Sequence, residues 1–398
     1  MLTGKSILLG VSGGIAAYKA AELVRLFVKA GAGVQVVMTA SAQRFVTPLT
    51  FEALSGQPVC TDLFDLGLES QIGHIQVARA AQLVVLAPAT ANLVAKMAAG
   101  IADDYLTTVL LAAASPVLVC PAMNTRMYEH PATKRNLETL RKLGYHILEP
   151  EVGSLACKEE GPGRLPDPAA IFDAADGLLT PPTLAGKRVL VSAGPTWEPF
   201  DPVRFITNPS SGKMGYALAG VAAKRSAEVH LVSGPSSLCA PHGVTLRKVI
   251  TAEEMKEAVC ELSSQMDVII MAAAVSDYRP LLVAPHKVKK TAGDLTIELA
   301  RNPDILALLG KSRPASKRQV LVGFAAETQN LIENATEKLM QKNLDFIVAN
   351  NLMQSGSGFG TDTNQVKIID RSGTVTDLPC LSKEEVAAKI LDRVEQLL

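Results

Sequence analysis

The sequence has few aromatic residues and no net charge, and each shortage excludes a class of partner. Phe, Trp and Tyr make up 4% of the 398 residues, too few for the stacked aromatic platforms that bind single-stranded nucleic acids. Lys plus Arg and Asp plus Glu number 39 each, so no overall field favours nucleic acid or a membrane surface. Any site for an anion must therefore be a local feature of the fold.

Signals of three other protein classes are also missing. The six cysteines include no C-x-x-C pair, which argues against structural zinc or a disulfide framework and favours reduced thiols. No apolar run reaches the roughly 18 residues of a membrane span. Residues 1–6 lack the apolar core of a signal peptide. We therefore expect a cytoplasmic protein without a membrane segment.

The sequence does contain two similar α/β beginnings in a globular composition. Hydrophobic residues make up 48% and charged residues 20%, as in well-packed proteins. Residues 5–14 and 187–194 are both apolar runs that break into small residues, and a breaker-rich stretch at 174–186 separates them. We predict two Rossmann-like, three-layer α/β/α domains in series, 1–180 and 181–398, each with a mostly parallel sheet.

In the first half, a glycine turn joins the first predicted strand to a helix. Residues 7–11 predict a buried strand and residues 14–30 a helix, with Gly-Val-Ser-Gly-Gly at 10–14 between them. The turn lacks the G-x-G-x-x-G fingerprint, and no acidic residue ends the second strand at Thr39, so a nicotinamide cofactor is not indicated. A phosphate cradle and an ordinary tight turn both fit it.

Polar residues follow the other predicted strands of this half. They occur at 39–41, at 88–92 and at 121–124, where side chains either cap the next helix or bind a ligand. The amide of Asn124 can bind a carboxylate without adding a competing charge. His74 begins a predicted helix, a place where a lone histidine is usually structural. Cys157 lies in a glycine-bracketed loop, which suits either a flap over a site or a simply exposed cysteine.

Together these motifs resemble the flavin-dependent cysteine decarboxylases. The resemblance rests on residues 10–19, 73–75, 88–92, 121–127 and Cys157, in matching order and spacing. It implies an FMN-binding domain that builds its site between the subunits of a trimer. His74 is then the catalytic histidine, Asn124 and Met127 contact the substrate, and Cys157 is the proton donor. The implied FMN contacts are Gly13, Gly14, Thr39, Ser41, Pro88, Ala89, Thr90 and Ala91.

The chemistry of this family explains its need for a flavin. A cysteine carboxylate cannot leave as carbon dioxide directly, because the carbanion left behind has no electron sink. Oxidation of the thiol to a thioaldehyde supplies that sink, and the enethiolate left after decarboxylation is then reduced and protonated. The cofactor ends oxidised, so no net redox change results.

The second half contains a long polar excursion, a possible anion site and a cluster of cations. Residues 193–208 form the excursion. Residues 210–215 lead into a helix but lack the Walker spacing, so we favour only anion binding at the helix start. A predicted strand ends near Asp277, and residues 284–290 are rich in cations, which suits a metal-triphosphate site or a solvated lysine face. Lys338 and Lys342 share one helix face, a weak signal alone.

Four second-half motifs resemble the phosphopantothenate-cysteine ligases that use CTP. They are residues 208–215, 273–279, 302–305 and 323–328. With both halves in this order, nearly the whole chain resembles the bifunctional decarboxylase-ligase family of coenzyme A biosynthesis. The ligase half is then expected to activate 4'-phosphopantothenate as an acyl-cytidylate, releasing pyrophosphate, before the amine of cysteine attacks. The first half converts the product, 4'-phosphopantothenoylcysteine, to 4'-phosphopantetheine.

The second resemblance also implies residue roles and partners. Asn208 helps turn over the acyl-cytidylate and Lys287 stabilises charge as it forms, while Mg²⁺ neutralises the triphosphate. Trp197, where a basic residue is expected, and Pro209 depart from the family pattern. Trimeric contacts of the first half and dimeric contacts of the second imply a homo-oligomer, up to a dodecamer. The implied CTP contacts are Ala272, Ala273, Ala274, Asp277, Lys287, Pro303, Asp304, Ile305, Leu306, Phe324, Lys338 and Lys342.

One other function class fits the first half. Flavin-decarboxylase folds also occur as regulatory subunits that bind flavin without catalysis. The joint presence of His74, Asn124 and Cys157 argues against that alternative, because binding alone needs no proton donor on a flap.

Overall fold

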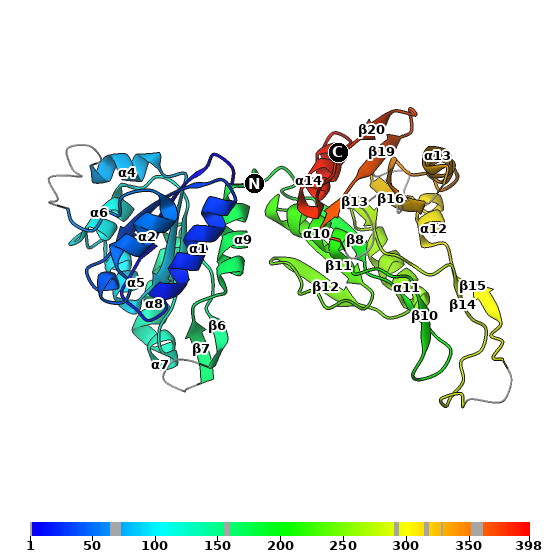
Figure 1. Ribbon diagram of the computed structural model, residues 1–398, viewed down its shortest axis with the longest axis horizontal. Coiled ribbons are helices and arrows are strands. Elements are labelled where there is room, and N and C mark those ends of the chain that lie inside the picture. Colours follow the sequence, from blue (N-terminus) through cyan, green and yellow to red (C-terminus); the bar gives the residue numbers. More distant parts are fainter. Residues whose placement is uncertain are drawn as a thin grey trace. The chain divides into compact units, whose positions relative to one another are not determined.

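The computed structural model describes residues 2–63, 73–154, 160–289, 294–313, 318–327, 329–351 and 361–398. The chain divides into two compact units, Met1–Pro181 and Pro182–Leu398, each built on its own sheet (Figure 1).

The first unit is built on a five-stranded parallel sheet with the order β2-β1-β3-β4-β5. Alternate residues of a strand point to opposite faces, so strands this apolar need helices on both faces. In β1, Leu8 packs in the core on one face, whereas Ile7 and Leu9 pack in the core on the other. The strands are β1 (Ser6–Val11), β2 (Gly33–Met38), β3 (Leu83–Ala89), β4 (Val117–Pro121) and β5 (His146–Ile147).

Helices cover both faces of this sheet (Figure 1). α1, α2 and α9 cover one face, and α4, α5, α6 and α8 cover the other. In α1, Ala20, Val24 and Phe27 are three or four positions apart and therefore form one buried stripe. The helices are α1 (Ala17–Lys29), α2 (Pro48–Ser55), α4 (His74–Ala80), α5 (Ala91–Ala99), α6 (Tyr105–Ala112), α7 (Thr125–Glu129), α8 (Pro131–Lys142) and α9 (Pro168–Leu179).

The second unit has an eight-stranded sheet with the order β12-β11-β8-β13-β16-β17-β19-β20. The pairs from β12 to β17 are parallel, and β19 and β20 extend the sheet in antiparallel pairing. The strands are β8 (Arg188–Ala193), β11 (Glu228–Ser233), β12 (Val244–Lys248), β13 (Val268–Met271), β16 (Val320–Glu327), β17 (Phe346–Asn351), β19 (Val366–Asp370) and β20 (Val375–Asp377).

Among the described residues, two helices cover one face of this second sheet and three cover the other. α10 (Lys213–Lys224) and α14 (Lys383–Glu395) pack on the face that holds Val268 and Ile270 of β13. α11 (Ala252–Ser263), α12 (Ile305–Lys311) and α13 (Leu331–Gln341) pack on the face that holds Ile269. The two units thus confirm the predicted fold class, and the antiparallel extension is an addition to it.

Two small hairpins stand outside the large sheet of the second unit (Figure 1). The polar excursion contains β9 (Trp197–Pro199) and β10 (Phe205–Thr207), and a later hairpin pairs β14 (Tyr278–Pro280) with β15 (Leu299–Arg301). In the described part of the first unit, β6 (Glu151–Ser154) pairs in the same way with β7 (Glu160–Arg164). None of the helices in the described ranges combines the length and the apolar character of a membrane crossing.

Candidate active sites

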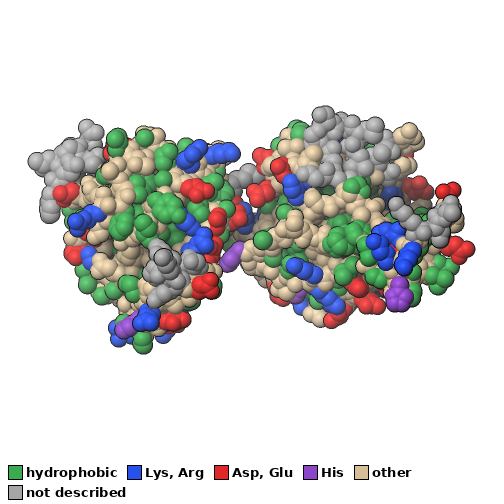
Figure 2. Space-filling model, turned by 60° about the horizontal axis from the view of Figure 1, so that its bottom comes forward, with side chains coloured by type: hydrophobic (Ala, Val, Ile, Leu, Met, Phe, Trp, Pro, Cys, Tyr) green, Lys and Arg blue, Asp and Glu red, His purple; other side chains and the backbone are tan. Residues whose placement is uncertain are grey.

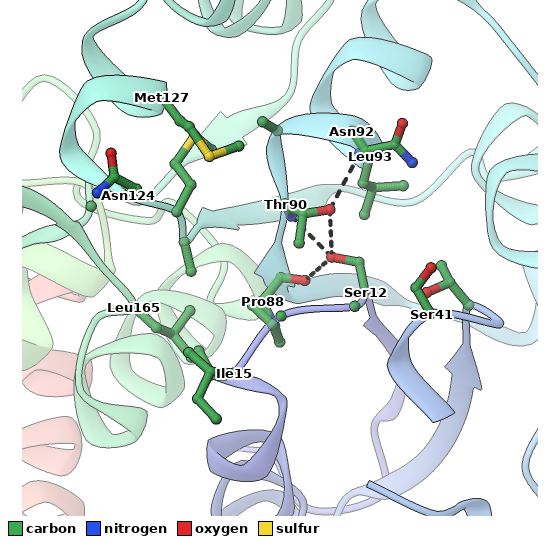
Figure 3. A pocket seen from close by; sticks show the side chains of 18 of the residues that line it. Ser12, Ile15, Ser41, Pro88, Thr90, Asn92, Leu93, Asn124, Met127 and Leu165 are labelled. Carbon is green, nitrogen blue, oxygen red and sulfur yellow. Dashed lines mark hydrogen bonds between the residues drawn. The ribbon is translucent and has the colours of Figure 1, made fainter. Parts of the chain in front are cut away.

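A cavity of about 1080 Å³ lies at one edge of the first sheet (Figure 3). Its walls come from the segments that follow β1, β2, β3 and β4, because the carboxyl ends of parallel strands meet at the same edge. It exceeds the range of about 300–1,000 Å³ that is usual for small-molecule sites. The predicted site residues that line it are Gly13, Gly14, Thr39, Ser41, Pro88, Thr90, Ala91, Asn124 and Met127.

The remaining predicted residues of this half lie elsewhere. Ala89 is fully buried in β3. His74 is the first residue of α4 and is half-buried, outside the set of side chains that line the cavity. Cys157 lies outside the described residues, between β6 and β7.

Ser12 is a cavity residue that the sequence reasoning missed. Its side chain is buried, its Oγ donates to the carbonyl of Pro88 at 2.7 Å, and the same Oγ accepts from the amide of Thr90 at 2.9 Å. The Oγ atoms of Ser12 and Thr90 are 3.2 Å apart, as the dashed lines in Figure 3 show. Ser12 therefore joins the turn after β1 to the turn after β3. Its position inside the glycine turn of residues 10–14 was the sequence feature that could have indicated it.

The two glycines after Ser12 differ in the space that a side chain would have. A Cβ at Gly13 would lie 2.3 Å from Cβ of Ser41, so a larger residue there would push the turns after β1 and β2 apart. A Cβ at Gly14 would lie 3.5 Å from Cγ2 of Thr90, an ordinary contact. Close packing of two turns is thus the physical reason for Gly13.

Thr90 and Asn124 both cap helices at the edge of the cavity. Oγ1 of Thr90 accepts from the amide of Leu93 at the start of α5, and Oδ1 of Asn124 accepts from the amide of Arg126 in α7. Capping fixes both side chains beside the cavity. In Figure 3, Asn124 and Met127 lie on one side of it, and Ser12, Thr90 and Ser41 lie across from them.

The β6-β7 hairpin is attached to the loop that carries Asn124. The amide of Met123 donates to the carbonyl of Gly163 at 2.9 Å. Gly163 has φ +134°, and a Cβ there would lie 2.2 Å from the carbonyl oxygen of Met123. A side chain at this position is therefore excluded both by conformation and by contact.

In the second unit, Asn208 is bound to the end of β13. Its Nδ2 donates to the carbonyls of Ala274 at 3.3 Å and Val275 at 3.1 Å. The amide of Ala273 donates to Oγ of Ser192 in β8, and the amide of Ala274 donates to the carbonyl of Gly194. The structure thus brings the predicted Asn208, Ala273 and Ala274 to one group at two strand ends.

A second group forms where α12 begins. Asp304 caps α12 by accepting from the amide of Ala307, and it forms an ion pair with Lys342 at 2.9 Å. Burial raises the pKa of Asp304, but the Ala307 hydrogen bond and the charges of Lys342 and Lys338 outweigh it, so that the pKa lies below its usual value. Both predicted lysines therefore lower the pKa of the same carboxylate.

The other predicted nucleotide contacts lie on several elements of the second unit. The carbonyl of Asp277 accepts from the amide of Asn302, which connects the end of β13 to the start of α12. Ile305 is buried and Leu306 half-buried in the core beneath α12, whereas Phe324 packs against the core on the opposite face of the sheet. Pro303 and Ala272 are half-buried.

Lys287 lies on a separate segment. It is exposed in the stretch between β14 and β15, and the backbone of the next residue, Val288, is hydrogen-bonded to Asp201 and Arg204 in the turn between β9 and β10.

Trp197, one of the two departures from the family pattern, stacks on Phe205 with ring centroids 4.2 Å apart.

The chain is similar to known protein families over almost its whole length. A family model described as "Flavoprotein" matches residues 1–180, and the model for the "DNA/pantothenate metabolism flavoprotein C-terminal domain" matches residues 184–398. The coenzyme A biosynthesis bifunctional protein CoaBC of Bacillus subtilis (strain 168) is 50% identical over 401 residues, which cover 100% of this chain and 98% of that protein. This chain belongs to the CoaBC family of bifunctional proteins. The CoaBC protein of Escherichia coli (strain K12) is 48% identical over 397 residues, covering 99% and 97%.

Membership of this family confirms two predictions made from the motifs. The chain is a flavoprotein, and it is a bifunctional enzyme of coenzyme A biosynthesis with a decarboxylase part and a ligase part.

Proposed function

We propose that residues 181–398 join 4'-phosphopantothenate to cysteine at the expense of CTP, and that residues 1–180 decarboxylate the product with FMN. The observation that carries this proposal is the cavity of the first unit. It gathers the expected flavin residues of three strand ends together with Asn124 and Met127, in a chain similar from end to end to the bifunctional proteins.

The residues around the cavity suit FMN. The N-termini of α1 and α5 and the hydroxyl of Thr90 offer hydrogen-bond partners for a phosphate. Ile15 and Leu165 give the cavity an apolar wall (Figure 3) against which a flat ring system can pack. When bound, the flavin supplies reversible two-electron oxidation of the substrate thiol.

In this proposal the protein's own side chains bind the substrate and move protons. The amide of Asn124 holds the carboxylate until it departs, and Met127 packs against the substrate. His74 accepts a proton from the thiol, and Cys157 returns a proton to carbon after carbon dioxide has left. The hydrogen bond by which Asn124 caps α7 supports its proposed role in holding the carboxylate, because capping fixes the side chain at the cavity edge.

We propose that the decarboxylase site is completed in a homo-oligomer. Ile15, Tyr18 and Met127 belong to the cavity wall, yet they are 62%, 61% and 49% exposed, and Figure 2 shows hydrophobic side chains exposed on the first unit. A subunit partner would cover them and bring its own His74 within reach. Trimeric contacts of the first unit and dimeric contacts of the second would then build a dodecamer.

For the ligase site we propose CTP with Mg²⁺ as the activating nucleotide. A carboxylate becomes a good electrophile when joined to a phosphate, and lysines already placed where phosphate charge develops stabilise that step. Lys338 and Lys342 converge on Asp304, and Asn208 is fixed at the end of β13. Within the described ranges, no group of three or more His, Cys, Asp or Glu side chains could hold a metal. We also propose a cytoplasmic location, where thiols such as that of the buried Cys120 stay reduced.

The test incubates the purified protein with 4'-phosphopantothenate, cysteine, Mg²⁺ and one nucleoside triphosphate at a time, and follows pyrophosphate and carbon dioxide separately. We expect both products with CTP, and carbon dioxide without any nucleotide when 4'-phosphopantothenoylcysteine is supplied. Equal pyrophosphate release with ATP would contradict the choice of CTP. A colourless protein that does not bind added FMN would contradict the decarboxylase assignment.

A further inference from the structure

The segment that carries Lys287 is attached at two points to the turn between β9 and β10. At its start, the amide of Ala284 donates to the carbonyl of Phe200 at 3.0 Å. At its end, the amide of Val288 donates to Oδ2 of Asp201 at 3.1 Å, and Nη2 of Arg204 donates to the carbonyl of Val288 at 2.8 Å. Both polar groups of the Val288 backbone are therefore fixed, directly after Lys287.

Asp201 is built into this attachment. Its side chain is 1% exposed, and a carboxylate so buried is costly unless its oxygens accept hydrogen bonds. Oδ1 accepts from the amides of Val203 and Arg204, both at 2.8 Å, which closes the turn locally. Oδ2 accepts from Arg204 Nε and Nη2 at 3.0 and 2.6 Å and from the distant Val288. One oxygen thus makes the turn, and the other holds the Lys287 segment.

The ion pair with Arg204 determines whether Asp201 acts on Lys287 through its charge or through the backbone. Because Arg204 already neutralises the carboxylate, Asp201 does not compete with a ligand for the ammonium group. Its effect on Lys287 passes through the backbone. A lysine stem is long and has several rotatable bonds, so an anchored backbone restricts where the ammonium can reach, and small misplacements in a catalytic site can cost about 100-fold in rate.

We propose that Asp201 is a positioning residue of the ligase reaction, which holds Lys287 in place through the amide of Val288. This inference rests on the proposed role of Lys287 in stabilising the acyl-cytidylate as it forms. It adds a residue that the sequence reasoning left inside an unassigned polar excursion.

The primary test is Asp201→Asn in the full chain, with Glu261→Gln as its control. The control removes a carboxylate from an exposed ion pair of the same unit, with Arg247. Asparagine preserves shape and is at home in turns, so its oxygen can keep the two local bonds. Its NH₂ then faces the Val288 amide and the Nε and Nη2 atoms of Arg204, donor against donor. We expect hydrogen exchange of the Val288 amide to become faster, and kcat for pyrophosphate release to fall about ten- to a hundred-fold, as for a lost hydrogen bond to a charged group. Carbon dioxide release from supplied intermediate should not change.

A double-variant cycle separates positioning from a structural effect. If Asp201 acts through Lys287, adding Asp201→Asn to Lys287→Ala should cause no further loss of ligase activity. The same fold-loss in both backgrounds would overturn the proposal. Full ligase activity of Lys287→Ala alone is a different result, because it would refute the proposed role of Lys287 itself.

A second variant decides the matter if Asp201→Asn does not fold. Val288→Pro removes the amide donor and leaves the bonds between Asp201 and Arg204 in place. We expect it to slow pyrophosphate release as Asp201→Asn does, with normal decarboxylation. Unchanged ligase activity in Val288→Pro would overturn the proposal.

Discussion

The two units share one layered fold but present their candidate sites differently. In the first, four neighbouring parallel strands end at one edge and their following segments enclose a cavity. In the second, Asn208 is fixed at strand ends, Asp304 with Lys342 lies at the start of α12, and Lys287 stands on a separate segment. The comparison teaches that the sheet brings the side chains after its strands together at one edge, whereas a residue on a separate segment depends on buried anchors.

The largest expected effect tests whether the two sites are separate. Lys287→Ala should lower acyl-cytidylate formation by about 100- to 1,000-fold, the size of losing one preorganised donor to developing charge. Decarboxylation of supplied 4'-phosphopantothenoylcysteine should be unchanged. Pyrophosphate and carbon dioxide assays measure the two steps. The control is Lys367→Ala, which removes a lysine of β19 that is paired with Asp377 of β20. Loss of both activities in Lys287→Ala would contradict separate sites.

The next variant divides the first site's reaction into its two halves. Cys157→Ser should still release carbon dioxide but stop at the unsaturated thiol, because the proton donor for the reductive step is gone. Mass spectrometry of the product distinguishes the unsaturated from the saturated thiol. Cys239→Ser, at an exposed cysteine of the second unit, should give the normal product. Full conversion by Cys157→Ser would refute the assigned role.

A glycine substitution tests whether the cavity depends on close packing of strand-end turns. Gly13→Ala would place a Cβ 2.3 Å from that of Ser41, and such overpacking costs about 1–3 kcal/mol. We expect weaker FMN binding in a fluorescence titration, with pyrophosphate release unaffected. Gly33→Ala is matched, since its nearest neighbour would be 3.9 Å away. Equal FMN affinity in both variants would argue against this role of Gly13.

The smallest expected effect concerns Asp304 in the second unit. Its pKa is lowered in the folded protein, so its contribution to stability is present above the unfolded-state pKa and is lost as pH falls through the folded-state pKa. Lys342→Met removes one cause of the lowering and should move acid unfolding to a slightly higher pH. Circular dichroism of the full chain measures the midpoint, and Lys248→Met, at an exposed β12 residue, is the control. A shift to lower pH would contradict the ion pair's effect.

The sequence predicted well what depends on local pattern. Continuous apolar runs indicated β1, β3 and β4 as buried parallel strands, and the polar residues after β3 and β4, such as Thr90 and Asn124, are at the cavity edge. Ser12 was missed because its partners, Pro88 and Thr90, are more than seventy positions away. Asp201 was missed for the same reason, since Val288 is 87 positions away. Long-range hydrogen bonds leave no periodicity in a sequence.

The most direct test of two independent centres removes the flavin from the full chain. In the flavin-free protein we expect pyrophosphate release from CTP, 4'-phosphopantothenate and cysteine to continue at its normal rate. Carbon dioxide release should stop and return when FMN is added. Loss of both reactions on removing the flavin would contradict two separate centres, and carbon dioxide formed without the flavin would contradict its role in the decarboxylation.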